Sequence, residues 1–147
     1  MVKLLDAHIS QNMSISGGIS IPVTATPALF GTLGLRTDGA GPNIRVQFTA
    51  TVAISSVAAI AVPIRISIFR GTGPNAVLIY SATELPIALG AIGAVNRRII
   101  TVTGADYRPP NPGSLLVYQA FVSTEGGVAI APTRTGPESF NAAAYSD

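Results

Sequence analysis

Apolar and polar residues alternate along much of this chain, which is the period of a β-strand rather than of a helix. The clearest run covers 43–54, and its apolar positions are Ile44, Val46, Phe48, Ala50, Val52 and Ile54. A second run, Val62 to Ile68, also has an apolar residue at every other position and stops at the turn sequence 71–75. We interpret the two runs as neighbouring antiparallel strands.

Turn residues divide the rest of the chain into further short strands. The 15 glycines and 11 prolines leave few uninterrupted windows long enough for a helix. Strands are expected at Leu29–Leu35, Val77–Ala82, Arg97–Thr103, Ser114–Ser123, Gly127–Pro132 and Ser139–Tyr145. About eight strands at intervals of about 8 to 14 residues predict an all-β protein, a jelly-roll β-sandwich of antiparallel strands. An immunoglobulin-like sandwich is the main competitor.

The first 28 residues follow a different pattern. Serine, glycine and proline separate the apolar residues of this segment, which are Ile15, Ile19, Ile21 and Val23. Pro22 and Pro27 have no amide donor, so the segment suits a sheet edge or a position between subunits. A dozen extended residues would reach about 40 Å at about 3.3 Å each. We therefore predict an extended N-terminal assembly arm over 1–28 and a jelly-roll domain over 29–147.

The composition excludes several kinds of chemistry. Hydrophobic residues make up 48% of the chain and charged residues only 11%, and there is no cysteine. Disulfides, thiolate metal sites and thiol nucleophiles are thus absent. A net charge of +2 is too small to predict a nucleic-acid partner, and no apolar stretch is long enough for a transmembrane helix. This composition favours a structural or interaction protein.

The candidate catalytic groups are sparse. Asp6 and His8 resemble an acid-base dyad, but no other motif surrounds them, so we expect a solvated tail. The other carboxylates are scattered among turns and element ends, which leaves open a pair formed in space. The glycine-rich segment 71–75 lacks the lysine of a phosphate loop and is interpreted as a hairpin turn. Arg97 and Arg98 should point to opposite faces of a strand. We predict no catalytic residue, no metal site and no cofactor, and no enzyme.

Several strand and turn motifs together resemble a known group of proteins. They are Ser20-Ile-Pro-Val-Thr-Ala-Thr-Pro-Ala-Leu-Phe30, Pro42-Asn-Ile-Arg-Val-Gln-Phe48, Ile66-Ser-Ile-Phe-Arg70 and Gly136-Pro-Glu-Ser-Phe140. The chain resembles the small jelly-roll proteins of spore surfaces in endospore-forming Firmicutes, which include exosporium proteins and endospore appendage subunits. The resemblance implies a trimeric, tumour-necrosis-factor-like jelly roll, or a subunit that polymerises by inserting its N-terminal arm into the next subunit. This chain has neither a Gly-X-Y collagen repeat nor the cysteines of one appendage class.

The resemblance and the arm together predict a structural subunit of a spore-surface fibre, a pilus-like endospore appendage or exosporium filament. Its partners would be copies of itself, in a helical fibre or in trimers, and an anchoring protein on the spore surface. A donated six-residue strand would contribute on the order of 10 kcal/mol before ordering costs. The short apolar run near residue 4 predicts synthesis in the cytosol without a signal peptide. The alternatives are a trimeric binding module at a fibre tip and a viral capsid or decoration protein.

Overall fold

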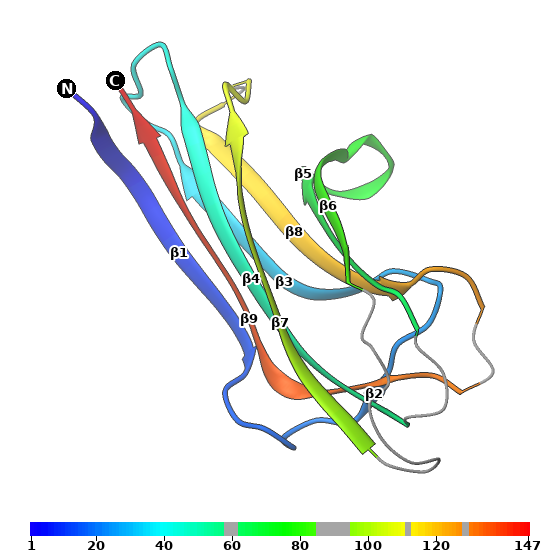
Figure 1. Ribbon diagram of the computed structural model, residues 1–147. Helices are drawn as coiled ribbons and strands as arrows, with labels where there is room; N and C mark the ends of the chain where they lie inside the picture. Colours follow the sequence, from blue (N-terminus) through cyan, green and yellow to red (C-terminus); the bar gives the residue numbers. More distant parts are fainter. Residues whose placement is uncertain (58–61, 85–94, 111–112, 128–129) are drawn as a thin grey trace.

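The structure is a computed structural model that describes residues 1–57, 62–84, 95–110, 113–127 and 130–147. These residues form two antiparallel β-sheets that face one another (Figure 1). The strands are β1 (Lys3–Met13), β2 (Ile21–Pro22), β3 (Ala28–Arg36), β4 (Arg45–Val57), β5 (Ile64–Arg70), β6 (Val77–Glu84), β7 (Val95–Tyr107), β8 (Leu115–Thr124) and β9 (Thr133–Ser146). A short 3-10 turn, η1 (Gly73–Asn75), joins β5 to β6.

The strand order identifies a jelly roll. One sheet has the order β1-β9-β4-β7, with β2 added to β9, and the other has the order β3-β8-β5-β6. The chain therefore changes sheets at almost every connection, and among the described strands only β5 and β6 form a hairpin within one sheet. This arrangement confirms the predicted all-β jelly-roll sandwich. The two ends of the chain lie side by side, because β1 pairs with β9 (Figure 1).

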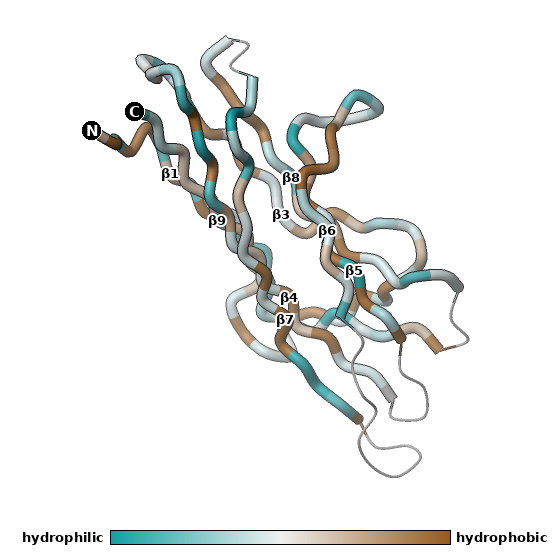
Figure 2. The backbone as a smooth tube through the Cα atoms, turned by 45° about the horizontal axis from the view of Figure 1, so that its top comes forward, coloured by the Kyte–Doolittle hydropathy of each residue, from teal (hydrophilic) through white to brown (hydrophobic). Residues whose placement is uncertain are grey.

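The core fills the space between the two sheets. The alternating apolar residues of β4, from Val46 to Ile54, are all buried, and they face Ile64, Ile66 and Ile68 of β5 within one cluster. Figure 2 colours the apolar positions of these strands brown and the polar positions between them teal or pale. Each buried Val or Ile side chain contributes about 1.5–3 kcal/mol. The period-2 pattern thus identified the face that β4 and β5 turn inward.

The pairing of two strands was predicted wrongly. The runs 43–54 and 62–68 correspond to β4 and β5, but these strands lie in different sheets, and β5 pairs with β6 and β8. Alternation reports which face is buried but not which strand lies alongside. The strand expected at 139–145 is confirmed as part of β9, whereas the strand expected at 127–132 is wrong at the residues described there. The end of the chain forms one strand, β9, while residues 127 and 130–132 lie outside strands and residues 128–129 are not described.

The N-terminal segment pairs with the body of its own chain in this structure. β1 runs antiparallel to β9 from Lys3 to Met13, and Val23 is buried, with a relative exposure of 1%. Of the other residues predicted for the arm, Ile15 and Ile21 are exposed and Ile19 is half-buried. The division of the chain at residue 28 and the exchange of this segment between subunits stay predictions.

Candidate association face

The outer face of the β1-β9-β4-β7 sheet carries no charged side chain in its central part. The strand registers align its residues in three rows, which are Ala7–Ala143–Gln47–Ala105, Ile9–Asn141–Thr49–Thr103 and Gln11–Ser139–Thr51–Thr101. Designed soluble surfaces carry about 25–35% charged residues, whereas these twelve positions carry none. We call these three rows the neutral face.

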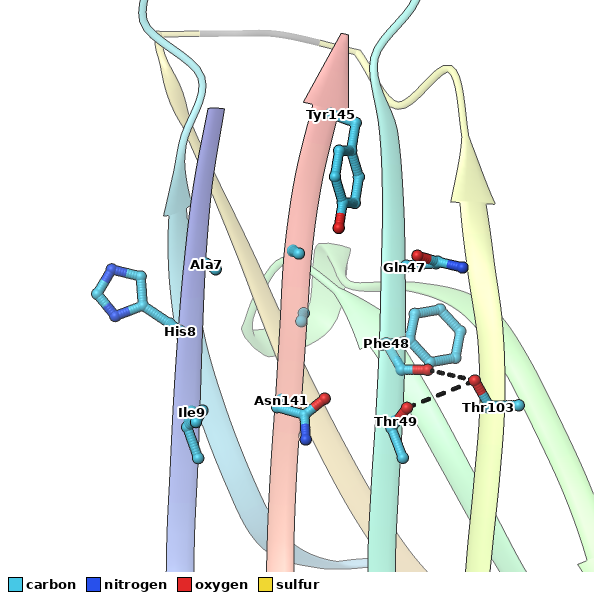
Figure 3. A pocket seen from close by; sticks show the side chains of 11 residues that line it. Ala7, His8, Ile9, Gln47, Phe48, Thr49, Thr103, Asn141 and Tyr145 are labelled. Carbon is cyan, nitrogen blue, oxygen red and sulfur yellow. Dashed lines mark hydrogen bonds between the residues drawn. The ribbon is translucent and has the colours of Figure 1, made fainter. Parts of the chain in front are cut away.

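Hydroxyl groups on two neighbouring strands hold the middle of the neutral face. Thr49 donates a hydrogen bond to Thr103 over 3.4 Å, and Thr103 donates to the carbonyl oxygen of Phe48 over 3.1 Å (Figure 3). The hydroxyls of Thr51 and Thr101 are 3.0 Å apart. These bonds fix the threonine rotamers before any partner arrives, which lowers the entropy cost of association.

A shallow depression of about 460 Å³ lies over the neutral face. Ile9 and Asn141 form part of its lining, and Tyr145 closes one end (Figure 3). His8 belongs to the rim, and its ring points away from the sheet (Figure 3). The lining offers apolar surface and amide groups, which suit packing against another protein surface better than they suit acid-base chemistry.

One end of the neutral face continues into a row that contains Leu4, Tyr145, Arg45 and Tyr107. Leu4 and Tyr107 are 58% and 74% exposed. Arg45 donates to the carboxylate of Asp147 over 3.0 Å. Hydrogen bonds from the Asn43 amide and then from Arg45 lower the pKa of Asp147 below its ordinary value. The charge of Arg45 is therefore balanced within the chain.

A buried ion pair lies on the opposite, inner side of β9. Arg134 and Glu138 are 4% and 0% exposed, and the guanidinium donates to both carboxylate oxygens, over 2.5 and 2.6 Å. Asn12 of β1 donates to Glu138 over 2.7 Å. The sequence interpretation missed this pair, because it placed every carboxylate at a turn or an element end. The signal was present, since both residues share the alternate positions of Phe140 and are opposite in charge.

A second buried cluster links the two sheets. Asp106 of β7 accepts hydrogen bonds from Arg70 of β5, over 2.6 Å, and from the hydroxyl of Tyr118 of β8, over 2.9 Å. Burial, followed by the nearby Asp106 carboxylate, raises the pKa of Tyr118 far above its ordinary value. Tyr118 therefore remains a neutral hydrogen-bond donor, and the cluster has a structural role.

Asp6 and His8 contact one another on β1, and the Asp6 carboxylate is also bound to the backbone of β3. Asp6 accepts a hydrogen bond from the backbone N–H of Arg36 over 2.8 Å, and this bond is the main reason why the pKa of Asp6 is lowered. The His8 ring lies 3.4 Å from the same carboxylate. The solvated tail expected here is instead part of β1, and Asp6 caps the edge of β3. Among the described residues, no three His, Cys, Asp or Glu side chains gather to hold a metal.

The two remaining sequence hypotheses concern a turn and a pair of arginines. Residues 71–75 lie in the connection between the antiparallel strands β5 and β6, which confirms the hairpin turn. Arg97 pairs with Ser55 and Arg98 with the buried Ile54. The two arginines therefore lie on opposite faces of β7, as predicted. No helix among the described residues is long and apolar enough to span a membrane.

No family model and no curated protein matches this chain. Solved structures do match, among them the structure of Eiger TNF from S. frugiperda. That match covers 94% of this chain and 92% of the other, with 10% sequence identity and a TM-score of 0.45. The jelly-roll assignment rests on the strand order described above.

Proposed function

We propose that this chain is a homo-oligomeric jelly-roll module, with a trimer as its smallest assembly, that acts by binding or by structural support. The observation that carries the proposal is the neutral face. An uncharged, hydroxyl-lined and partly apolar sheet face, with its charges balanced at the end, is suited to contact with a second protein surface. A second copy of this chain is the occupant that the proposal commits to.

The size of the face favours a ring over a face-to-face dimer. Four strands about 4.8 Å apart and three rows of about two residues each, at about 3.3 Å per residue, give about 380 Å². Two such faces would bury about 760 Å² in total, which is below the roughly 1,000 Å² expected of a specific interface. In a cyclic trimer each copy contributes its neutral face to one neighbour and a different surface to the other, so two surfaces of each copy are buried instead of one.

The oligomeric state tests this proposal directly. We expect the purified chain to sediment as a trimer in analytical ultracentrifugation. Asn141→Arg introduces a cation at an exposed, central position of the neutral face and should give a monomer. The matched control is Ser81→Arg, at an exposed position of β6 in the other sheet, which should remain trimeric. A monomeric parent protein, or equal behaviour of the two variants, would refute the proposal.

A second candidate function is the spore-surface fibre suggested by the resemblance, in which β1 pairs with β9 of a neighbouring subunit. One observation favours it. β1 is an edge strand whose sheet partner is β9 alone, so the same register can form between two copies without changing the rest of the sheet. Because donor and acceptor surfaces differ, such exchange would propagate into a fibre or close into a ring.

The absence of cysteine allows a clean test of this exchange. Ala7 and Ala143 are directly paired across β1 and β9, so both can be replaced by cysteine and oxidised. Exchange between copies should give covalent ladders on a non-reducing denaturing gel, whereas pairing within one chain gives a cross-linked monomer. Ladders together with filaments in negative stain support the fibre. Cross-linked monomers alone would overturn it, and the single-cysteine variants serve as controls.

A further inference from the structure

A second, smaller pocket lies beyond the neutral face, at the end of the sheet where β7 begins. Its volume is about 220 Å³. Ser16 and Gly17 form one wall, and the N–H of Gly17 donates to the carbonyl oxygen of Thr135 in β9 over 2.9 Å. Arg97 and Ile99 of β7 form the opposite wall. The floor includes Ala53, which is only 5% exposed although it belongs to the outer face.

Arg97 brings an unbalanced positive charge to this pocket. All 7 acidic residues of the chain lie within the described ranges, and each is paired with another side chain. The pairs are His8–Asp6, Arg36–Asp38, Arg45–Asp147, Arg65–Glu125, Arg70–Asp106, Arg98–Glu84 and Arg134–Glu138. No carboxylate among the described residues pairs with Arg97. Arg108, on the loop after β7, is the other described arginine for which no carboxylate partner is found.

The groups around Arg97 match the parts of one class of ligand. The guanidinium offers a planar fork for a carboxylate or a sulfate. Ser16 and Thr135 place two hydroxyl-bearing side chains on the lining, which can exchange hydrogen bonds with the hydroxyls of a sugar. Ile99 is 61% exposed and supplies an apolar wall for the C–H face of a ring. The pocket is smaller than the roughly 300–1,000 Å³ typical of drug-sized ligands, so it would hold about one ring.

We propose that this pocket binds an acidic monosaccharide, as a terminal sugar or a substituted unit of a glycan, with its carboxylate or sulfate on Arg97. The inference goes beyond the proposed function, because the pocket lies outside the three rows of the neutral face and its ligand is a sugar rather than a second copy. The trimer proposal and the sugar-binding proposal can therefore fail independently of one another.

Isothermal titration of the full chain with three sugars tests the proposal. We expect glucuronic acid or galactose 6-sulfate to bind with a Kd in the millimolar range and neutral galactose to bind at least tenfold more weakly. Comparing the two acidic sugars shows whether the pocket prefers a carboxylate or a sulfate. Arg97→Gln should reduce binding of the preferred sugar at least tenfold, and Arg97→Lys should recover part of it. The matched control is Arg108→Gln, which removes the other unbalanced arginine and should leave binding unchanged.

Three results would overturn the assignment. They are equal binding of neutral and acidic sugars, an unchanged affinity in Arg97→Gln, and an equal loss in Arg97→Gln and Arg108→Gln, which would indicate general attraction to a basic protein. Far-ultraviolet circular dichroism establishes that each variant is folded. Titration of the monomeric Asn141→Arg variant separates the two proposals, because it should bind the acidic sugar as the parent does.

Discussion

Replacing Glu138 by glutamine should destabilise the fold more than any exposed charge change. The variant keeps the shape of the side chain but removes the anion that Arg134 faces. With relative exposures of 4% and 0%, neither group can recover its hydration without local opening. Removing one partner of a buried pair typically costs about 3–5 kcal/mol, because the remaining charge is left uncompensated. For a chain of this length we expect the melting temperature to fall by about 6–20 °C.

The companion variant carries both Arg134→Met and Glu138→Met. It removes the two charges together and leaves side chains of similar length, so it avoids the uncompensated charge. We expect its free energy of unfolding to lie within about 1 kcal/mol of the parent value, or above it. The two single changes would then be strongly non-additive, with a coupling energy of several kcal/mol.

Equilibrium unfolding in urea measures these differences at one protein concentration. Asp38→Asn is the control, because the Arg36–Asp38 pair is 76% and 56% exposed and its loss should leave the midpoint unchanged. Two outcomes would contradict the reasoning. One is a loss below about 1 kcal/mol for Glu138→Gln, which would show that Arg134 reaches water. The other is a double variant that loses the sum of the two single losses.

The remaining predictions concern the sheet-to-sheet link, the β1 cap and the packing. Tyr118→Phe should lower the free energy of unfolding by about 1 kcal/mol and Asp106→Ala by about 2–3 kcal/mol, measured in urea; equal losses would contradict this order. The pKa of Asp6 is lowered below its ordinary 3.8, so its stabilisation is present above that pH and is lost as the pH falls through the lower folded value. As the pH falls below 3.8, the free energy of unfolding should therefore decrease less steeply in Asp6→Asn than in the parent. An unchanged slope would show that the hydrogen bond from the Arg36 N–H to Asp6 does not stabilise the fold. Gly104→Ala would place a Cβ 2.9 Å from two aromatic rings and should cost about 1–3 kcal/mol by thermal melting, whereas a neutral result would mean that the rings can move.

Periodicity predicted the strands that bury one complete face. The run at 43–54 corresponds to β4, Arg45–Val57, because every second residue of this central strand enters the core. β1 could not be found in this way, since it is an edge strand whose residues are exposed or half-buried and show no alternation. Its position depends on backbone pairing with β9 and on the cap that Asp6 forms on β3. These long-range contacts leave no local signature in the sequence.

The sequence shows which residues the candidate sites contain but not how these residues are arranged in space. The sparse charge and the threonine pairs are visible in the sequence, but their alignment into one neutral face depends on the order β1-β9-β4-β7. Arg97 was noticed as half of an arginine pair, and its lack of a partner follows only from knowing where all the carboxylates lie. The pairing of Asp106 with Tyr118 joins different sheets, which spacing along the chain cannot reveal.

Ionic strength should separate the two proposed surfaces in a single protein. The neutral face has no charge to screen, and contact between such faces depends on apolar burial and short hydrogen bonds. The pocket depends on a charge–charge contact near solvent, and the screening length falls from about 10 Å at 0.1 M salt to about 3 Å at 1 M. Raising sodium chloride to 1 M should therefore leave the trimer intact in sedimentation and weaken binding of the acidic sugar severalfold. Dissociation of the trimer by salt would show that charged rim residues, and not the neutral face, hold the copies together. Binding that salt leaves unchanged would show that Arg97 does not contact the anionic group.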